Sequence, residues 1–393
     1  MRRATGLGAL LVAVVLVGLS LRGPVVAIAP LIPALSTDLD LPSWAAGLLT
    51  SLPLLCFAVV SPLVAVLARR LGVDGALFVG LVLLAFAAAL RPWAGAGLLL
   101  LGTALVGVGI TVGNVVVPVI VRRDAGRRAP MVMAVSTSAY GVGQGIASAS
   151  VVPLAAEIGW RGAATTLAVP VVLAVGAWLL RMRAKQGDAL VVPAGAPRGG
   201  VWREGDAWWL AGFFGMQAML FYSASTWLPS QLAEDAGLSE TAAGTALSVF
   251  HLVGILGTLA VPACMRLLAG GRGAGITFGS LWCVFFAGLA LAPALWPLWV
   301  ILGGFTQGAG IGLGLTLIAI RPVDPDYGRD LSAMVQSAGY AVAAAGPVLL
   351  GAVHETTGSW AAVSWLCVGA GALMVVAAPR AGADRAIGAP ARS

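Results

Sequence analysis

The feature that most constrains this chain is a succession of apolar segments, each long enough to cross a lipid bilayer, that continues through its whole length. A membrane-spanning helix needs ~20 mostly apolar residues. Only 10% of the residues are charged, less than half of the ~25% that is usual in a soluble domain. The runs are unbroken, whereas a membrane barrel alternates in ~10-residue strands. The sequence therefore predicts an all-α membrane protein with twelve transmembrane helices. We place them at 7–35, 44–68, 75–92, 96–121, 131–156, 161–181, 207–230, 240–265, 273–294, 296–319, 331–354 and 359–378.

The longest polar interruption divides these segments six and six. We predict an N-terminal six-helix bundle over 1–181, a cytoplasmic linker over 182–206, a C-terminal six-helix bundle over 207–380 and a disordered cytoplasmic tail over 381–393. The first residues resemble a signal peptide, with two arginines before an apolar stretch. Because no small-residue cleavage site follows, we interpret them as the first, retained membrane helix.

The basic residues are distributed unequally between the two sides of the predicted membrane. If the N-terminus is cytoplasmic, 20 of the 23 Lys and Arg residues fall in cytoplasmic segments, Arg91 and Arg161 fall opposite, and Arg22 lies inside a helix. Cytoplasmic loops of membrane proteins are enriched in Lys and Arg. We therefore expect both termini in the cytoplasm. The net charge of +7 then reflects topology, and no nucleic-acid partner is expected.

The chain also repeats itself. WAAGLLTSLP (44–53) and TAAGTALSVF (241–250) are related by a shift of 197 positions, and Tyr140 and Tyr340 stand 200 apart. The two halves are thus pseudo-equivalent six-helix bundles duplicated in one orientation. This plan resembles that of major facilitator transporters, which bind substrate near the bilayer midplane at the interface of the two repeats.

Several other classes of protein lack support. No GxxxxGK[ST] motif occurs, and glycine clusters such as GAGIGLG (308–314) lie inside apolar segments, where small residues allow close helix packing. The four cysteines show no CxxC spacing, and no buried nucleophile, metal cluster or acid pair is evident. We therefore expect no enzyme activity, no cofactor and no metal. The two-fold repeat also argues against a channel.

Arg22 is the most informative residue. It lies about fifteen residues into the first helix, which at 1.5 Å per residue is ~22 Å deep. An arginine at that depth marks a functional site by default, and all 16 acidic residues fall in loops or near helix ends. Arg22 is therefore a candidate receptor for an anion, or for an acceptor-rich group such as nitro or carbonyl. The alternative is that it binds backbone carbonyls freed by Pro24 and Pro30, or a water chain.

A few other polar side chains lie within predicted helices. The candidates for substrate binding are Asn114, Gln217, Tyr222, Gln307 and His251. The repeat sets Arg22 opposite Ala218, beside Gln217. Each amide alone could equally join two helices or contact a substrate. His251 could carry a proton or act as a neutral hydrogen-bonding group.

Four charged residues near predicted cytoplasmic loops are candidates for gating. Arg321 begins the loop RPVDPDYGRD, which also carries Asp324, and we favour a gate or positioning ion pair there over a substrate contact. Arg69 and Arg70 lie in LARRLGVDG (67–75), at the place of the superfamily's gating motif. Arg69 occupies the position of that motif's usual aspartate.

The segments LRGPVVAIAPLIPAL, GVGITVGNVVVPVIVRRD and TQGAGIGLGLTLIAIRP resemble the cyanate transporter/2-nitroimidazole exporter (CynX/NimT) family of major facilitators. The resemblance covers most of the chain. It implies a bacterial inner (plasma) membrane location, a small substrate, and a cavity lined by Arg22, Asn114, Gln217, Tyr222 and Gln307.

We therefore expect a secondary active transporter that works by alternating access. Its substrate is either a small anion, cyanate-like or carboxylate, or a neutral nitroheterocycle or drug that is exported. The expected partners are this small molecule and the lipid bilayer, with protons as a candidate coupling ion. We expect a monomer.

Overall fold

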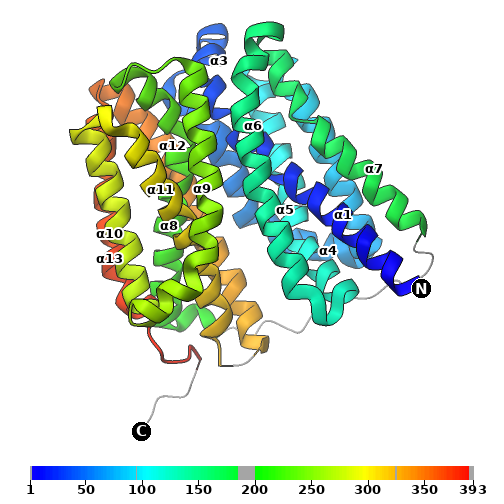
Figure 1. Ribbon diagram of the computed structural model, residues 1–393. Coiled ribbons are helices and arrows are strands. Elements are labelled where there is room, and N and C mark those ends of the chain that lie inside the picture. The colour runs from blue at the N-terminus through cyan, green and yellow to red at the C-terminus, as the bar shows by residue number, and fades with distance from the viewer. Residues whose placement is uncertain (1, 94, 185–199, 324, 389–393) are drawn as a thin grey trace. The chain divides into compact units, whose positions relative to one another are not determined.

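The computed structural model describes residues 2–93, 95–184, 200–323 and 325–388, and its described elements are all helices (Figure 1). The chain forms two compact units. One comprises Met1–Pro42 and Leu48–Pro193, and the other comprises Ser43–Gly47 and Ala194–Ser393. The central part of the predicted linker, 185–199, lies outside the described residues.

The first unit contains the helices of the N-terminal half. They are α1 (Arg2–Leu21), α2 (Gly23–Val26), η1 (Ala29–Leu31), α3 (Ile32–Leu39), α4 (Ser43–Leu90), η2 (Arg91–Trp93), α5 (Ala96–Ala125), η3 (Gly126–Arg128), α6 (Ala129–Thr166) and α7 (Val169–Ala184). The first turn of α4 groups with the second unit. Gly72 in α4 and Gly159 in α6 have non-helical backbone angles, so each of these elements consists of two helices joined at a sharp turn.

The second unit contains the helices of the C-terminal half. They are η4 (Val201–Arg203), α8 (Gly205–Asp235), α9 (Glu240–Leu267), α10 (Gly270–Leu291), η5 (Pro293–Leu295), α11 (Trp296–Ile320), α12 (Pro325–Thr357) and α13 (Trp360–Ala381). Ser239 and Ser359 begin α9 and α13, where each side chain accepts a hydrogen bond from a backbone N–H of the first turn. Such caps satisfy donors that a helix end leaves unpaired.

Ten segments of the described chain are long and apolar enough to cross a membrane. One of them, Met131–Ala184, has 54 residues, enough for two crossings of ~20 residues each. Helix α8 is less apolar, but its 31 residues also exceed the length of one crossing. Together these segments supply the twelve membrane helices that the sequence predicts.

The backbone turns confirm the internal duplication. A positive φ, which residues other than glycine rarely adopt, recurs at matching positions of the two halves. The matching pairs, 197, 197 and 199 positions apart, are Asp40 (φ 50°) with Gly237 (φ 67°), Gly72 (φ 71°) with Ala269 (φ 56°), and Gly159 (φ 73°) with Gly358 (φ 62°). Each pair ends a membrane helix, so the duplicated halves reverse the chain at the same places.

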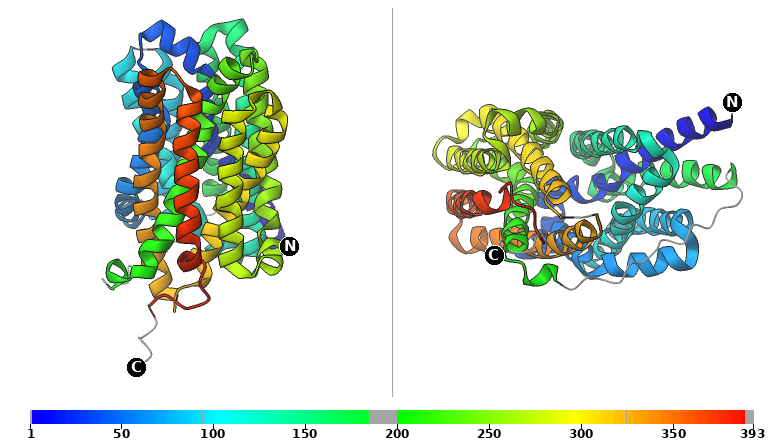
Figure 2. Two further views of the ribbon diagram at one scale, coloured as in Figure 1. Left: turned by 90° about the vertical axis from the view of Figure 1, so that its left-hand side faces the viewer. Right: turned by 90° about the horizontal axis from the view of Figure 1, so that it is seen from below.

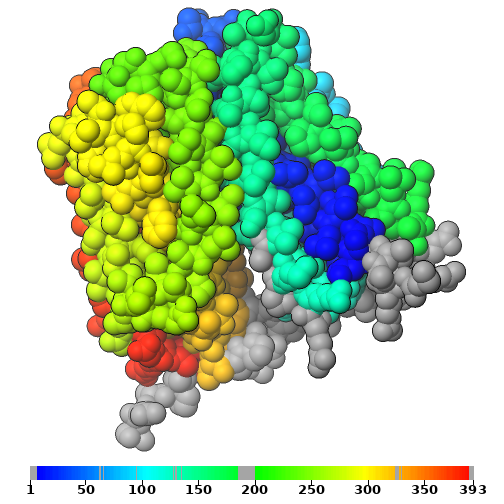
Figure 3. Space-filling model, in the orientation of Figure 1, coloured from blue at the N-terminus to red at the C-terminus, as the bar shows by residue number. Residues whose placement is uncertain are grey.

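The helices of each unit also pair in the same way. In the second unit α8 packs along α12, α9 along α11 and α10 along α13 (Figures 1 and 2). In the first unit α1 packs against α6 and α7, and Figure 3 shows α1 between these two helices. Gly107 of α5 contacts Pro53 and Cys56, which lie in α4 before the Gly72 turn. The Trp178 indole of α7 donates to Asp74 O, which lies in α4 after that turn. The order of pairing therefore matches in the two units.

The tail differs from its prediction. Helix α13 ends at Ala381, and the following residues up to Gly388 are held against the loop after α11. Ile387 N donates to Arg321 O at 2.7 Å, and Val323 N donates to Ile387 O at 3.1 Å. Ile387 is 1% exposed. The predicted disordered tail is thus ordered over 382–388, because these backbone bonds and the burial of Ile387 compensate for the cost of ordering it. Residues 389–393 lie outside the described part.

Candidate substrate site

The first membrane helix is interrupted at Arg22. Helix α1 ends at Leu21, α2 begins at Gly23, and Arg22 lies between them with φ −106° and ψ −23°. Pro24 explains the break locally, since proline has no N–H and its ring clashes with the preceding helical turn. Two further prolines, Pro30 and Pro33, open η1 and α3. Arg22 is therefore carried by a discontinuous helix, as binding residues of transporters often are.

The Arg22 side chain is half-buried and lies over an aromatic ring of α6. Its guanidinium carbon is 5.7 Å from the centre of the Tyr140 ring. A cation at this distance from a ring face is attracted by the ring's quadrupole. The ring also limits the directions in which the guanidinium can point. The sequence did not single out Tyr140 as a site residue, although its spacing from Tyr340 marked the repeat.

Asn114 lies on α5, next to the place where α5 meets the end of α1. A Cβ at Gly113 would come within 2.7 Å of the Leu21 side chain. Arg22 directly follows Leu21 in the sequence, and Asn114 directly follows Gly113. Asn114 is half-buried, and its amide has no hydrogen bond among the described residues. An amide in this state has donors and an acceptor to offer to a ligand.

The amides of Gln217 and Gln307 both bind backbone groups of neighbouring helices, and Gln307 Nε2 donates to Phe250 O of α9 at 3.5 Å. Gln217 is fully buried; its Nε2 donates to Gln307 O at 3.1 Å and its Oε1 accepts from Trp282 Nε1 at 2.7 Å. Gly310 and Gly254 lie against the amides of Gln217 and Gln307, respectively. These bonds fit the interpretation that Gln217 joins α8, α10 and α11. Substrate contact by either glutamine stays a prediction.

Tyr222 and His251 belong to an aromatic cluster of the second unit. The imidazole of His251 is 1% exposed and lies between Phe221 and Phe250, with ring centres 6.0 and 5.5 Å away. Tyr222 is 4% exposed and packs edge-on against Phe221. Both residues are thus surrounded by apolar rings. Their predicted contact with substrate and the proton role of His251 remain predictions.

The predicted gating residues lie in different surroundings. Arg69 and Arg70 are exposed near the Gly72 turn, and Asp324 lies outside the described residues. Arg321 is 3% exposed and donates to the carbonyls of Arg380, Ala381 and Arg385, with Asp206 Oδ2 at 3.5 Å. Burial lowers the pKa of Arg321, and Asp206 opposes this change. Arg321 therefore anchors the end of α13.

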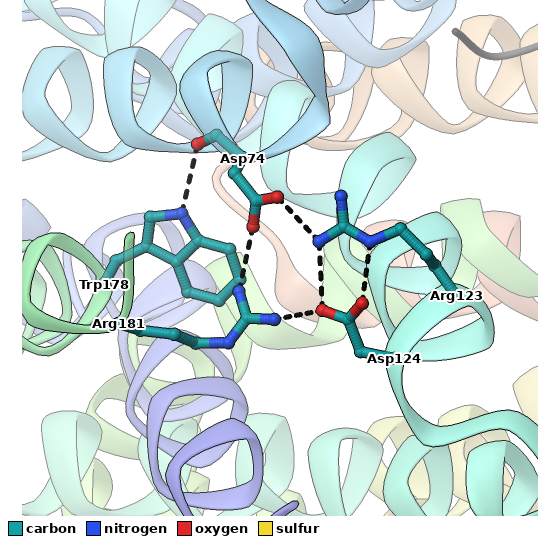
Figure 4. Close-up of polar contacts among 5 residues, drawn as sticks. All are labelled: Asp74, Arg123, Asp124, Trp178 and Arg181. Atoms are coloured by element: carbon teal, nitrogen blue, oxygen red, sulfur yellow. Dashed lines mark hydrogen bonds and ion pairs between the residues drawn. The ribbon is translucent and has the colours of Figure 1, made fainter. Parts of the chain in front are cut away.

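Sequence reasoning missed a charged cluster in the first unit (Figure 4). Asp74 accepts from Arg123 at 2.6 Å and from Arg181 at 2.8 Å, and Asp124 also binds both arginines. The Arg181 guanidinium lies 4.5 Å from the Trp178 ring centre. Two acids and two arginines balance in charge, so the cluster ties α4, α5 and α7 together. The basic loops had been interpreted as topology alone, which concealed it.

Comparison with known proteins gives the family. The model of the Major Facilitator Superfamily matches residues 9–327. The chain belongs to the major facilitator superfamily. It is 35% identical to the 2-nitroimidazole transporter of Escherichia coli K12 over 356 residues, which cover 89% of each chain. It is 27% identical to the cyanate transport protein CynX of the same organism over 361 residues, 89% of this chain and 91% of that protein.

A solved structure supports the same fold. The nucleoside transporter NupG matches with a TM-score of 0.77 over 94% of this chain and 98% of that one, at 12% identity. The family match and the sequence relatives make the chain a multi-pass membrane transporter. Its relatives agree with the resemblance to the CynX/NimT family that the sequence motifs indicated.

Proposed function

We propose that this transporter moves a small anion, such as cyanate or a small carboxylate, and that Arg22 receives its charge. The observation that carries the proposal is a permanently charged guanidinium, half-buried at a break in the first membrane helix. Arginine is the side chain best suited to bind a carboxylate through two parallel hydrogen bonds, and it offers a linear anion such as cyanate a fixed charge and an N–H donor. A CynX relative named as a cyanate transport protein agrees with this substrate class.

Two further residues of the first unit complete the proposed site around Arg22. Asn114 supplies an amide without a hydrogen bond among the described residues, and Tyr140 orients the guanidinium. Gln307, Gln217, Tyr222 and His251 stay the candidate substrate-binding residues of the second half. In transporters built from such repeats, alternating access exposes one site to each side of the membrane in turn.

A second candidate substrate is a neutral nitroheterocycle, which the transporter would export. The relative with 35% identity is named as a 2-nitroimidazole transporter. An Arg22 guanidinium that lies over Tyr140 could donate to a nitro group while the flat ring of the substrate stacks nearby. In this case Arg22 acts as a hydrogen-bond donor, and its charge is not essential.

Two substitutions of Arg22 separate these substrates. In proteoliposomes we would measure uptake and counterflow of labelled cyanate and labelled 2-nitroimidazole by the native protein, Arg22→Lys and Arg22→Gln. Lysine keeps the charge and glutamine keeps only neutral donors. For an anion, Arg22→Lys should retain part of the uptake, and Arg22→Gln should raise KM by roughly 10–100-fold, because charge-assisted hydrogen bonds contribute about 1.5–3 kcal/mol each.

For a nitroheterocycle, Arg22→Gln should retain more uptake than Arg22→Lys. Arg183→Gln is the matched control, since Arg183 is exposed at the end of α7. Native uptake of cyanate by Arg22→Gln would refute the proposal. Absence of saturable cyanate uptake by correctly inserted protein would remove cyanate, and carboxylates would be tested in its place.

We also propose an inner-membrane location with both termini cytoplasmic, which rests on the distribution of the basic residues. Reporter fusions at both ends, active only on one side of the membrane, test this topology. Uptake with and without an inward proton gradient tests proton coupling, and His251→Asn tests whether His251 carries the proton. A monomer is proposed and is testable by the mass of the detergent-solubilised particle.

A further inference from the structure

A second arginine is buried in the first unit, close to the break in the first helix. Arg91 follows the end of α4 and opens η2. Counting charges along the sequence placed it in a loop opposite the cytoplasm, but it is 1% exposed. None of the ion pairs among the described residues includes it, and its Nε has no hydrogen-bond partner there. Burying such a charge is costly, so its remaining contacts must be important.

The main contact of Arg91 is a backbone carbonyl of the broken helix. Its Nη2 donates to Pro24 O at 2.5 Å. In an unbroken helix this carbonyl would accept from the N–H of Ile28. The described backbone bonds at the break instead run from Val25 and Val26 to Arg22 O and from Ala27 to Gly23 O. Because freed backbone groups inside a membrane must find other partners, Arg91 supplies the donor that the helix lost.

Helix α5 is shaped to hold Arg91. The other terminal nitrogen, Nη1, donates to Thr103 Oγ1 at 3.3 Å. The neighbouring Gly102 lies so close to Arg91 that a Cβ there would collide with the Arg91 Cβ. Glycine at 102 therefore makes room for the arginine, and Thr103 accepts its second hydrogen bond. Arg91 thus links the break in the first helix to α5, the helix that also carries Asn114.

We propose that Arg91 is a positioning residue that holds the discontinuous segment Arg22–Val26 and thereby sets where the Arg22 guanidinium points. It acts through Pro24 O and does not touch the substrate. The inference rests on the proposed role of Arg22 in transport. Its consequence is that Arg91 controls substrate affinity through the carbonyl of Pro24, two residues after Arg22 in the broken helix.

The first test needs no substrate. With the four native cysteines replaced, the thiol introduced by Arg22→Cys is modified with a charged methanethiosulfonate, and the rate is measured with and without Arg91→Met. Losing a hydrogen bond to a charged group should change the population of the native segment, and hence the rate, by about tenfold. Arg91→Lys, which can still donate to Pro24 O, should largely restore the rate.

The matched control is the thiol introduced by Asn114→Cys in the same unit. Its modification rate should change by less than about twofold, because α5 keeps its own helical hydrogen bonds. An unchanged rate at position 22, or equal changes at 22 and 114, would overturn the proposal. If Arg91→Met does not fold, Gly102→Ala is used in its place, because the added Cβ displaces Arg91. The modification rates at positions 22 and 114 are then compared in the same way.

A second test separates this inference from the proposed function. In cyanate uptake, Arg91→Met should raise KM about tenfold with little change in maximal rate, because only the orientation of the binding group is disturbed. If Arg22→Gln abolishes uptake while Arg91→Met leaves KM unchanged, the positioning role is wrong and the substrate proposal stands. If Arg22→Gln has no effect, the substrate proposal fails, and the thiol rates still decide the role of Arg91.

Discussion

A comparison of two arginines of the first unit measures how much the charged cluster of Asp74, Arg123, Asp124 and Arg181 stabilises the fold. Arg181 lies 4.5 Å from the ring of Trp178 and binds Asp74 at 2.8 Å. Arg161 lies 4.5 Å from the ring of Trp160 and binds Asp38 at 2.6 Å. Each arginine thus lies over a tryptophan ring and binds a carboxylate, and Arg181 binds a second one, Asp124. They differ in burial, because the side chain of Arg181 is 8% exposed and that of Arg161 is 34% exposed.

The difference in burial predicts different costs for the same substitution. Arg181→Met leaves two acids facing one arginine at a nearly buried site, and removing one partner of a buried ion pair costs about 3–5 kcal/mol. Because the acids remain 13–21% exposed, we expect the lower end, about 3 kcal/mol. Arg161→Met breaks an exposed pair and should cost at most about 1 kcal/mol. In a unit of this size a loss of 1 kcal/mol lowers Tm by roughly 2–4 °C. Arg181→Met should therefore lower Tm by about 6–12 °C, and Arg161→Met by at most about 4 °C.

Thermal unfolding of both variants in one detergent measures this difference. Asp124→Asn added to Arg181→Met should recover part of the lost stability, since removing one charge of each sign restores the balance of the cluster. Equal falls in Tm for Arg181→Met and Arg161→Met would refute the reasoning. So would a double variant that is less stable than Arg181→Met alone.

Three further predictions concern the second unit. Arg321→Gln should lower Tm, because the three carbonyls that it binds lose their common donor. Deleting the chain after Ala381 should also lower Tm, because the Arg321 guanidinium loses the Arg385 carbonyl and Arg321 O loses the hydrogen bond from Ile387 N. Burial and then Glu234 raise the pKa of the Asp235 carboxyl despite the lowering effects of Gln231 and His354. The protonated form of Asp235 therefore stabilises the folded state. This contribution is complete only below the unfolded pKa of about 3.9 and is lost as the pH rises through the higher pKa of the folded state. Asp235→Asn should therefore raise Tm at pH 7 and have little effect below about pH 4. Gly257→Ala should lower Tm, because a Cβ there would collide with Phe305 O of α11, whereas Gly369→Ala meets open space and should not; unfolding scans of both variants measure the difference.

The fold could be predicted because its signals are local or periodic. The apolar runs gave the membrane helices, and the constant shift of about 197 positions gave the two halves. The break at Arg22 also followed from local chemistry, since Pro24 cannot continue a helix. In each case the residues that carry the signal are neighbours in sequence or repeat at a fixed spacing.

The contacts of the site could not be predicted in the same way. Arg181 and Asp74 are 107 positions apart, and Arg91 and Pro24 are 67 apart, so neither pair has a sequence signature. Arg91 precedes Pro92 and was counted with loop residues, because charge counting assigns a side of the membrane and gives no information on burial. From the sequence the amide of Gln217 could equally join two helices or contact a substrate, and only the fold shows that it binds Trp282 Nε1 and Gln307 O.

The duplication preserved the position of an anchor and changed its partners. Arg123 and Arg321 stand 198 positions apart, and each lies at the end of the fourth helix of its half. Arg123 binds the carboxylates of Asp74 and Asp124, whereas Arg321 binds three backbone carbonyls. The first anchor therefore depends on the acidic side chains that face it. The second depends on the path of the chain, so substituting the Arg380 side chain should leave it intact, whereas deleting the chain after Ala381 removes the Arg385 carbonyl from it.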